Sequence, residues 1–226
     1  MDKTIKLYKE WRFFIFLLLL MSVFRSAVAD WYTVPTASMK PSILEGDRIF
    51  VNKMAYGLRV PFTTIPVAKW SAPERGDVVV FESAVADKRL VKRVIGIAVD
   101  TVQIVANQLI VNGQQAEYQT SAPDSAAINW GNGNNPPLLL NERLAGLQHE
   151  VALSHTRSFF GPVTVPENHL FVLGDNRDNS ADSRFIGFVP INEVLGKAKG
   201  VIVSLNPDSY YLPRKARYFK AFDSDI

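Results

Sequence analysis

RGDVVVFESAVADKRLVKRVIGIAVDTVQIVANQLIV, residues 75–111, is the stretch that decides the fold class of this chain. Short runs rich in β-branched residues follow one another in it, at 78–81, 90–97, 102–105 and 108–111. Turn-forming residues separate these runs, and the pattern has no alternation of strands with helices. We therefore predict a mainly β fold, built as an antiparallel barrel or sandwich.

The same β pattern returns on both sides of a less regular region. Residues 48–54 and 169–173 have the pattern of strands. Between Asn112 and Pro162 the character of the sequence changes, and the segments 121–124 and 131–137 are predicted to be flexible loops. The expected parts are a β core at residues 30–111 and 163–212, an inserted subdomain at 112–162, and a C-terminal tail at 213–226.

The N-terminus combines basic residues with an apolar run. The run from Phe13 to Phe24 carries no charge, and Arg25 separates it from Ala27-Val-Ala29. One interpretation is a secretory signal peptide cleaved after Ala29. The other is an uncleaved anchor, residues 1–29, with a single transmembrane helix in which Arg25 reaches the membrane surface. Basic residues ahead of the run place this end of the chain in the cytoplasm: Lys3, Lys6, Lys9 and Arg12.

Composition excludes several classes of function. The 226 residues are 47% hydrophobic, as expected for an ordinary folded protein. The net charge of +3 is small and the basic residues are scattered, so nucleic-acid binding has little support. The chain has no cysteine, which excludes disulfides, thiol nucleophiles and metal sites built on Cys.

Ser38 is a candidate nucleophile because of the two prolines that flank it. Pro35 and Pro41 fix the backbone and lack N–H groups, so this segment cannot join a long helix or a central strand. A rigid and exposed serine suits nucleophilic attack, although most serines beside prolines are simple turn residues.

Lys92 and Arg93 are both candidates for a charged group beside such a serine. On the predicted strand 90–97, Lys92 shares a face with Leu90 and Val94, and Arg93 lies on the opposite face. Periodicity does not choose between them, and a solvated basic edge is the simpler interpretation. Chemistry favours Lys92, because burial lowers the pKa of a lysine, whereas an arginine stays protonated and cannot accept a proton.

The segment LGDNRDNSADSR, residues 173–184, gathers acidic and basic side chains in one loop. As an EF-hand loop it fails, because Arg177, Ser180 and Ile186 occupy the positions that need Asp or Asn, Gly and Glu. We predict instead an Asp–Arg network that fixes the loop, made by Asp175, Asp178 and Asp182 with Arg177 and Arg184.

Together the segments 34–47, 75–81, 89–96 and 173–190 closely resemble bacterial type I signal peptidases. These are membrane-anchored serine–lysine proteases that remove signal peptides from exported proteins, and the likeness spans roughly Val34 to Leu109 and Val165 to Val203. The resemblance favours the anchor over a cleaved signal peptide. It implies a single-pass protein of the bacterial inner (cytoplasmic) membrane with its catalytic domain outside the cytoplasm. Its partners would be preprotein signal peptides and the lipid bilayer, with no nucleic acid, metal or cofactor.

The resemblance also assigns roles to residues. It implies a Ser38 nucleophile and a Lys92 general base, with an oxyanion hole formed by the Ser38 N–H and the Thr36 hydroxyl. Ser180 would hydrogen-bond the lysine amine, and Asp182 and Arg184 would hold the loop. The shallow apolar walls that accept alanine would come from Val34, Met39, Ile43, Leu90 and Val91. The chain departs from the family at Gly96-Ile-Ala-Val-Asp100, where the family usually shows Gly-Leu-Pro-Gly-Asp.

Other interpretations belong to neighbouring or different classes. A serine–lysine processing peptidase of a secretion or conjugation system is the closest, and a self-cleaving repressor is less compatible with an anchor. A non-catalytic, anchored peptide-binding module is an alternative of another class. The presence of Ser38, Lys92 and Ser180 together argues against it.

Overall fold

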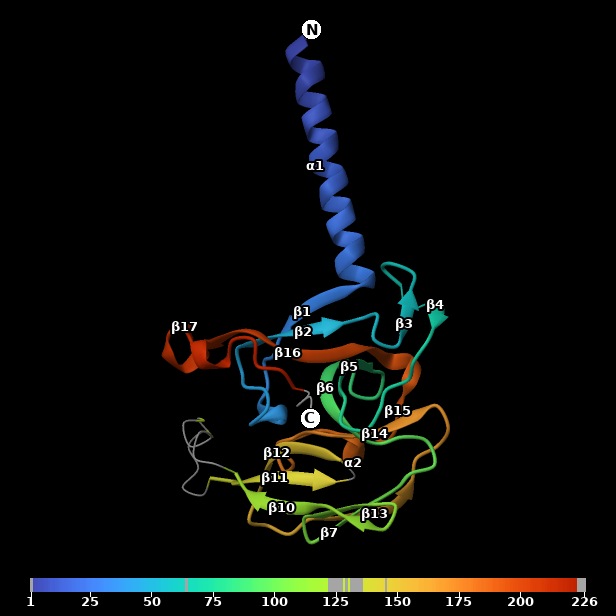
Figure 1. Cartoon of the computed structure of the whole chain (residues 1–226), viewed down its shortest axis with the longest axis vertical. Helices are drawn as coiled ribbons and strands as arrows, with labels where there is room; N and C mark the ends of the chain where they lie inside the picture. The colour runs from blue at the N-terminus through green and yellow to red at the C-terminus, as the bar shows by residue number, and fades with distance from the viewer. Residues whose placement is uncertain are drawn as a thin grey trace.

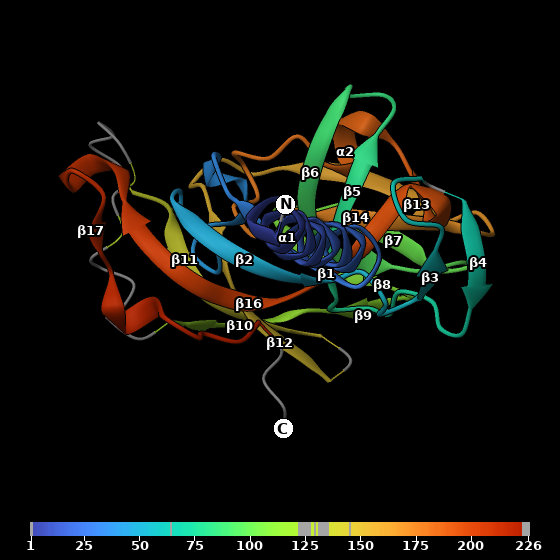
Figure 2. The same cartoon turned by 90° about the horizontal axis from the view of Figure 1, so that it is seen from above.

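The computed structural model describes residues 2–63, 65–121, 128, 130, 136–144 and 146–222. The flexible loops expected at 121–124 and 131–137 therefore fall largely outside the described residues. The N-terminal helix α1 (Asp2–Ala27) projects away from the β-rich remainder of the chain (Figure 1), and the view from above shows it nearly end-on (Figure 2). The large apolar side chains between Trp11 and Phe24 are all 40% or more exposed. In the described part of the chain, no helix combines the length and the apolar character that crossing a membrane requires.

The main sheet contains the strands that carry the candidate site. Its order is β1-β2-β16-β5-β6-β14-β15, and β17 pairs with β16. All the pairings between these strands are antiparallel, which confirms the prediction of a mainly antiparallel β fold. The strands are β1 (Ala29–Thr33), β2 (Asp47–Asn52), β5 (Val78–Ser83), β6 (Lys88–Gly96), β14 (His169–Leu173), β15 (Val189–Pro190), β16 (Val194–Asn206) and β17 (Leu212–Pro213).

Smaller antiparallel sheets surround the main one. Their orders are β13-β7-β8-β9, β10-β11-β12 and β3-β4. The strands are β3 (Gly57–Arg59), β4 (Pro66–Lys69), β7 (Thr101–Val105), β8 (Gln108–Val111), β9 (Gln114–Gln115), β10 (Glu117–Thr120), β11 (Leu138–Leu144), β12 (Leu147–Leu153) and β13 (Phe159–Thr164). The sheet β10–β12 lies within the expected insertion, whereas β13 crosses its expected end at residue 162 and pairs with β7.

The hairpin of β3 and β4 has a proline within a strand. Its strand β4 begins at Pro66 and pairs with β3. A proline is tolerated in this two-stranded hairpin because a strand with one neighbour has a side on which no N–H is needed.

Short helical segments connect the strands. They are η1 (Ala37–Met39), α2 (Ser183–Ile186), η3 (Ile191–Glu193), η4 (Pro207–Ser209) and η5 (Lys215–Arg217). The first two lie in the segments that the sequence marks as chemically important, before Pro41 and after Asp182.

The register between β5 and β6 buries the charged pair of β6. Val79 lies opposite Lys92, and Val78 lies opposite Arg93. The β-branched residues of β5 suit a central strand that is covered on both faces, and Val78 to Phe81 are fully buried. The two basic side chains are therefore withdrawn from water and each needs a partner.

Candidate active site

Ser38 lies in the short helix η1, where its main chain is held from outside the helix. Thr36 precedes η1 in an extended conformation, and the buried side chain of Met39 anchors the far end. The Asn176 N–H donates to the Ser38 carbonyl at 3.1 Å, and the Asn176 side chain donates to the Ala37 carbonyl at 3.1 Å. The Ser38 side chain is half-buried and therefore remains accessible.

The side chain of Lys92, a residue of β6, contacts the hydroxyl of Ser38. Its Nζ donates to Ser38 Oγ at 2.8 Å and to the Val91 carbonyl at 2.9 Å. The residue is only 1% exposed. Burial lowers the pKa of Lys92 to about 8, and the nearby carboxylates of Asp182 and Asp175 only partly oppose this shift. A large fraction of the amine is then neutral in mildly alkaline solution and able to accept a proton.

Arg93 has partners other than Ser38. The structure thereby distinguishes Arg93 from Lys92, which the sequence pattern could not do. Its Nε and Nη2 donate to the two carboxylate oxygens of Asp175 at 2.9 and 2.8 Å, and its Nη1 donates to the Gly76 carbonyl at 3.0 Å. This bidentate arrangement fixes the guanidinium away from the serine.

Thr36 places a hydroxyl beside the serine. Its Oγ1 lies 3.5 Å from Ser38 Oγ, and it makes no capping hydrogen bond to η1 although Thr36 is the N-cap residue. Thr36 is exposed, so its hydroxyl can donate to a group that approaches Ser38 from solvent.

Ser180 differs from the expectation drawn from the resemblance. Its Oγ is buried and has no hydrogen-bond partner in the described part of the chain, so the expected bond to the amine of Lys92 is not formed. The amine is instead turned to Ser38 and Val91. Ser180 still lies close to the site, because a Cβ built on Gly174 would collide with both Ser180 Oγ and the Ser38 carbonyl. Only glycine fits at position 174 without a shift in its neighbours.

Asp182 and Arg184 hold the loop locally, as the sequence suggests. Arg184 donates to both carboxylate oxygens of Asp182 at 2.8 Å. Asp182 also accepts from the Gly174 N–H at 3.1 Å and caps α2 through the Arg184 N–H. The carboxylate is completely buried, so these donors replace the water that it loses.

The other charged residues of the predicted Asp–Arg network have their direct partners outside the loop. Asp175 pairs with Arg93, and Asp178 accepts from the Ser154 N–H at 2.7 Å. Arg177 pairs with Glu142 of β11 at 2.7 and 2.5 Å. The true partners come from strands and turns far away in sequence, so the composition of the loop alone could not identify them.

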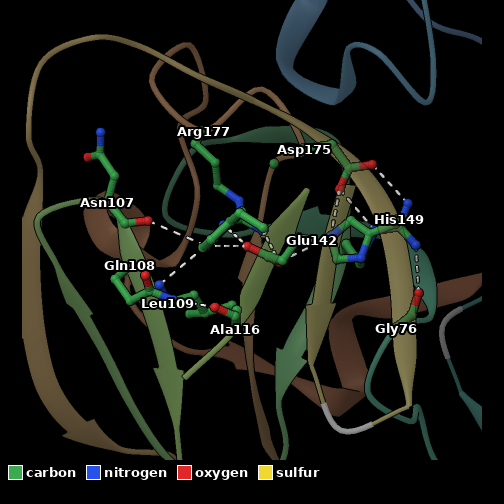
Figure 3. A network of polar contacts seen from close by, with 12 residues as sticks. Gly76, Asn107, Gln108, Leu109, Ala116, Glu142, His149, Asp175 and Arg177 are labelled. Carbon is green, nitrogen blue, oxygen red and sulfur yellow. Dashed lines mark hydrogen bonds and ion pairs between the residues drawn. The ribbon is translucent and has the colours of Figure 1, made fainter. Parts of the chain in front are cut away.

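The predictions from the sequence did not include three residues that contact this region: Glu142, His149 and Asn176. Figure 3 shows Glu142 and His149 directed toward Asp175 and Arg177. Glu142 is 1% exposed although it is charged, in a strand that is otherwise rich in leucine. A glutamate within an apolar run was the one available signal, because such a charge must find a partner when it is buried.

Comparison with known proteins identifies the family. The family model described as signal peptidase, peptidase S26, matches residues 8–203. This chain belongs to the signal peptidase family. It is therefore a serine endopeptidase of the signal peptidase I type, and this family acts on the signal peptides of preproteins.

Individual members show the extent of the similarity. The signal peptidase I of Pseudomonas aeruginosa is 33% identical over 216 residues, covering 88% of this chain and 74% of that protein. The signal peptidase I of Aquifex aeolicus is 32% identical over 233 residues and covers 86% of each chain. A crystal structure of a signal peptidase I from Enterococcus faecalis V583 is 32% identical and covers 55% of this chain and 95% of that one, with a TM-score of 0.36.

The residues expected to line the substrate pockets of this signal peptidase are divided between two clusters. Val34, Met39 and Ile43 belong to one buried apolar cluster, and Val91 packs against its edge. Leu90 packs against another cluster, around Phe81 and Val172. Met39 and Ile43 are almost fully buried, whereas Val91 is partly exposed.

Proposed function

We propose that this chain cleaves the signal peptides of exported preproteins after small residues, with Ser38 as nucleophile and Lys92 as general base. The observation that carries the proposal is the 2.8 Å contact between Lys92 Nζ and Ser38 Oγ, made by a lysine that is 1% exposed. A lysine can act as a base only when it is neutral, and burial supplies that condition here by lowering its pKa to about 8.

The reaction follows from this contact. Neutral Lys92 takes the proton of the Ser38 hydroxyl while Oγ forms a bond to the carbonyl carbon of the scissile peptide. The resulting ammonium gives that proton to the departing amine as the C–N bond breaks, which leaves an ester on Ser38. Lys92, neutral again, then takes a proton from a water molecule that attacks the ester, and it gives this proton to Ser38 Oγ as the ester C–O bond breaks, which releases the signal peptide and restores the serine hydroxyl.

Thr36 completes the site by binding the developing oxyanion. The negative oxygen needs donors in fixed positions, and the Ser38 N–H and the Thr36 hydroxyl supply two. The exposure of Thr36 and its 3.5 Å distance from Ser38 Oγ support this role. The ion pair of Asp182 and Arg184 keeps the loop that carries Ser180 close to the main chain of Ser38.

Substrate lies extended next to the apolar cluster of Val34, Met39 and Ile43, with Val91 at its edge. Partial exposure of Val91 beside the buried base supports a shallow wall that accepts small side chains. Leu90, which packs in the other cluster, contributes from the adjacent position of β6.

Helix α1 anchors the catalytic domain to the bacterial inner membrane, with the domain outside the cytoplasm. Support comes from the exposed apolar side chains of Phe13 to Phe24 and from the projection of the helix away from the sheets (Figure 1). Such a surface is unfavourable in water and suited to lipid.

A preprotein digest tests the proposal. The purified full chain is incubated in detergent with a preprotein whose signal peptide ends in Ala-x-Ala, beside a Ser38→Ala control. Cleavage after the second alanine by the wild type and none by Ser38→Ala is expected. Absence of cleavage by both proteins would favour a peptide-binding module, and equal cleavage by both would exclude Ser38 as the nucleophile.

A further inference from the structure

A buried ion pair connects the sheet β10–β12 to the loop that follows β14. Arg177 of this loop donates from its two terminal nitrogens to the two carboxylate oxygens of Glu142, at 2.7 and 2.5 Å. The hydroxyl of Tyr118, from β10, donates to the same carboxylate at 2.7 Å. Glu142 and Arg177 are 1% and 4% exposed, so solvent does not weaken their attraction.

The backbone reinforces the same connection. The Ala152 N–H of β12 donates to the Asp175 carbonyl at 2.9 Å, and the Arg177 N–H donates to the Ala152 carbonyl at 3.0 Å. Residues 175–177 are thus paired with β12 on both sides of Asn176. Asn176 itself holds the main chain of the nucleophile, through its N–H to the Ser38 carbonyl and its side chain to the Ala37 carbonyl.

The charges around this connection are balanced. Glu142 and Asp175 face Arg177 and Arg93, and the ring of His149 lies 3.3 Å from Glu142 Oε1 and 3.9 Å from Asp175 Oδ1 (Figure 3). Burial and the neighbouring Arg93 lower the pKa of His149 to about 4, so the ring is neutral at ordinary pH. Removal of the Glu142 charge therefore leaves Arg177 as an uncompensated buried cation, which must move toward water.

We propose that Glu142 is a positioning residue for signal-peptide cleavage: through Arg177 it fixes residues 175–177, and through Asn176 it keeps Ser38 at hydrogen-bonding distance from Lys92. This inference rests on the proposed roles of Ser38 and Lys92. Glu142 touches neither of them, and it comes from a strand more than 100 positions after the serine in the sequence. Glu142 thereby connects the sheet β10–β12 to the segment that positions the nucleophile.

The test measures the pH dependence of kcat for Glu142→Gln in the full chain, with folding checked by the melting temperature. When the loop loosens, water reaches Lys92, and the burial that lowers its pKa is reduced. The midpoint of the acid limb should then move up from about pH 8 by roughly one unit, and kcat at pH 8 should fall about fivefold. A simple loss of folded enzyme lowers the apparent kcat without moving the midpoint.

The controls separate the possible failures. Arg143→Ala changes the next residue of β11, which is exposed and contacts Gln148, and it should keep the wild-type rate and midpoint. If Glu142→Gln does not fold, Glu142→Asp keeps the charge but draws the carboxylate back by one methylene, and it should shift the midpoint in the same direction. An unchanged midpoint in the folded variant would overturn the inference. Cleavage that persists in Ser38→Ala would instead overturn the proposed function on which it rests.

Discussion

Lys92 and Arg93 are adjacent in β6 and almost fully buried, yet they have different partners. Arg93 donates from Nε and Nη2 to the two carboxylate oxygens of Asp175. Lys92 instead contacts a hydroxyl and a carbonyl, and within the described part of the chain it has no carboxylate in direct contact. Burial without a paired anion is what lowers the pKa of an amine. A catalytic base and a structural ion pair can therefore occupy consecutive positions of one strand.

Replacement of Lys92 should abolish turnover without unfolding the protein. Lys92→Met has no amine and Lys92→Arg stays protonated, so both should lose at least about 100-fold in kcat. Lys88→Ala, at the exposed start of β6, should stay within a few-fold of the wild type. Steady-state cleavage of one peptide by the variants checks this. A Lys92→Met enzyme with a tenth of the wild-type rate would require another base.

The rate should fall as the pH decreases through the pKa of Lys92. Protonation at acidic pH removes the lone pair that accepts the serine proton, so the active fraction is high above about pH 8 and declines roughly tenfold per unit below it. A profile of kcat against pH, recorded where the melting temperature is constant, checks the position of this limb. A limb near pH 10 would show that the lysine is hydrated in the working enzyme.

Thr36 should contribute through its hydroxyl alone. Thr36→Val keeps the shape but removes the donor, and loss of one oxyanion donor lowers kcat by about 100-fold to 1,000-fold. Thr36→Ser keeps the donor and should remain close to the wild type, since the side chain is exposed and fills no cavity. Equal rates for Thr36→Val and Thr36→Ser, measured at saturating substrate, would remove Thr36 from the oxyanion hole.

Among the individual elements, α1 is the one for which the sequence allowed two interpretations, a retained membrane anchor and a cleaved signal peptide. The anchor interpretation predicts that α1 stays attached to the mature protein and that the full chain partitions with membranes, because its apolar side chains are exposed. Intact mass measurement of the membrane fraction checks both points. A mature N-terminus at Asp30 would support the signal-peptide interpretation instead.

The loop after β14 shows why an element can be recognised before its contacts are known. Its acidic and basic residues identify it as important, and the Asp182–Arg184 pair forms within it. Its other charges reach partners in β6, β11 and the turn after β12. Charge composition indicates that ion pairs will form, but only tertiary packing decides which groups are close enough to form them.

For the whole molecule, the arrangement of the sheets predicts specificity for small residues. In the proposed substrate site, the wall would be the apolar cluster whose members Met39 and Ile43 are already packed, which would leave little depth for a substrate side chain. We expect alanine-sized residues at the first and third positions before the cleaved bond, because bulk and charge are rejected there. Peptides varied at these two positions check this, and efficient cleavage after Arg or Phe would contradict it.

The sequence by itself determined the mainly antiparallel β fold, since short β-branched runs separated by turns have few other solutions. Residue types made Ser38 and Lys92 candidates, and the resemblance to signal peptidases assigned roles to them and to Asp182 and Arg184. Only the tertiary structure decided that Lys92 Nζ meets Ser38 Oγ, that Arg93 belongs to Asp175, and that Ser180 Oγ is left without the expected lysine contact. The ion pair of Glu142 with Arg177 was likewise apparent only in the tertiary structure. A buried ion pair depends on which distant strands pack together, and that is a property of the folded chain as a whole.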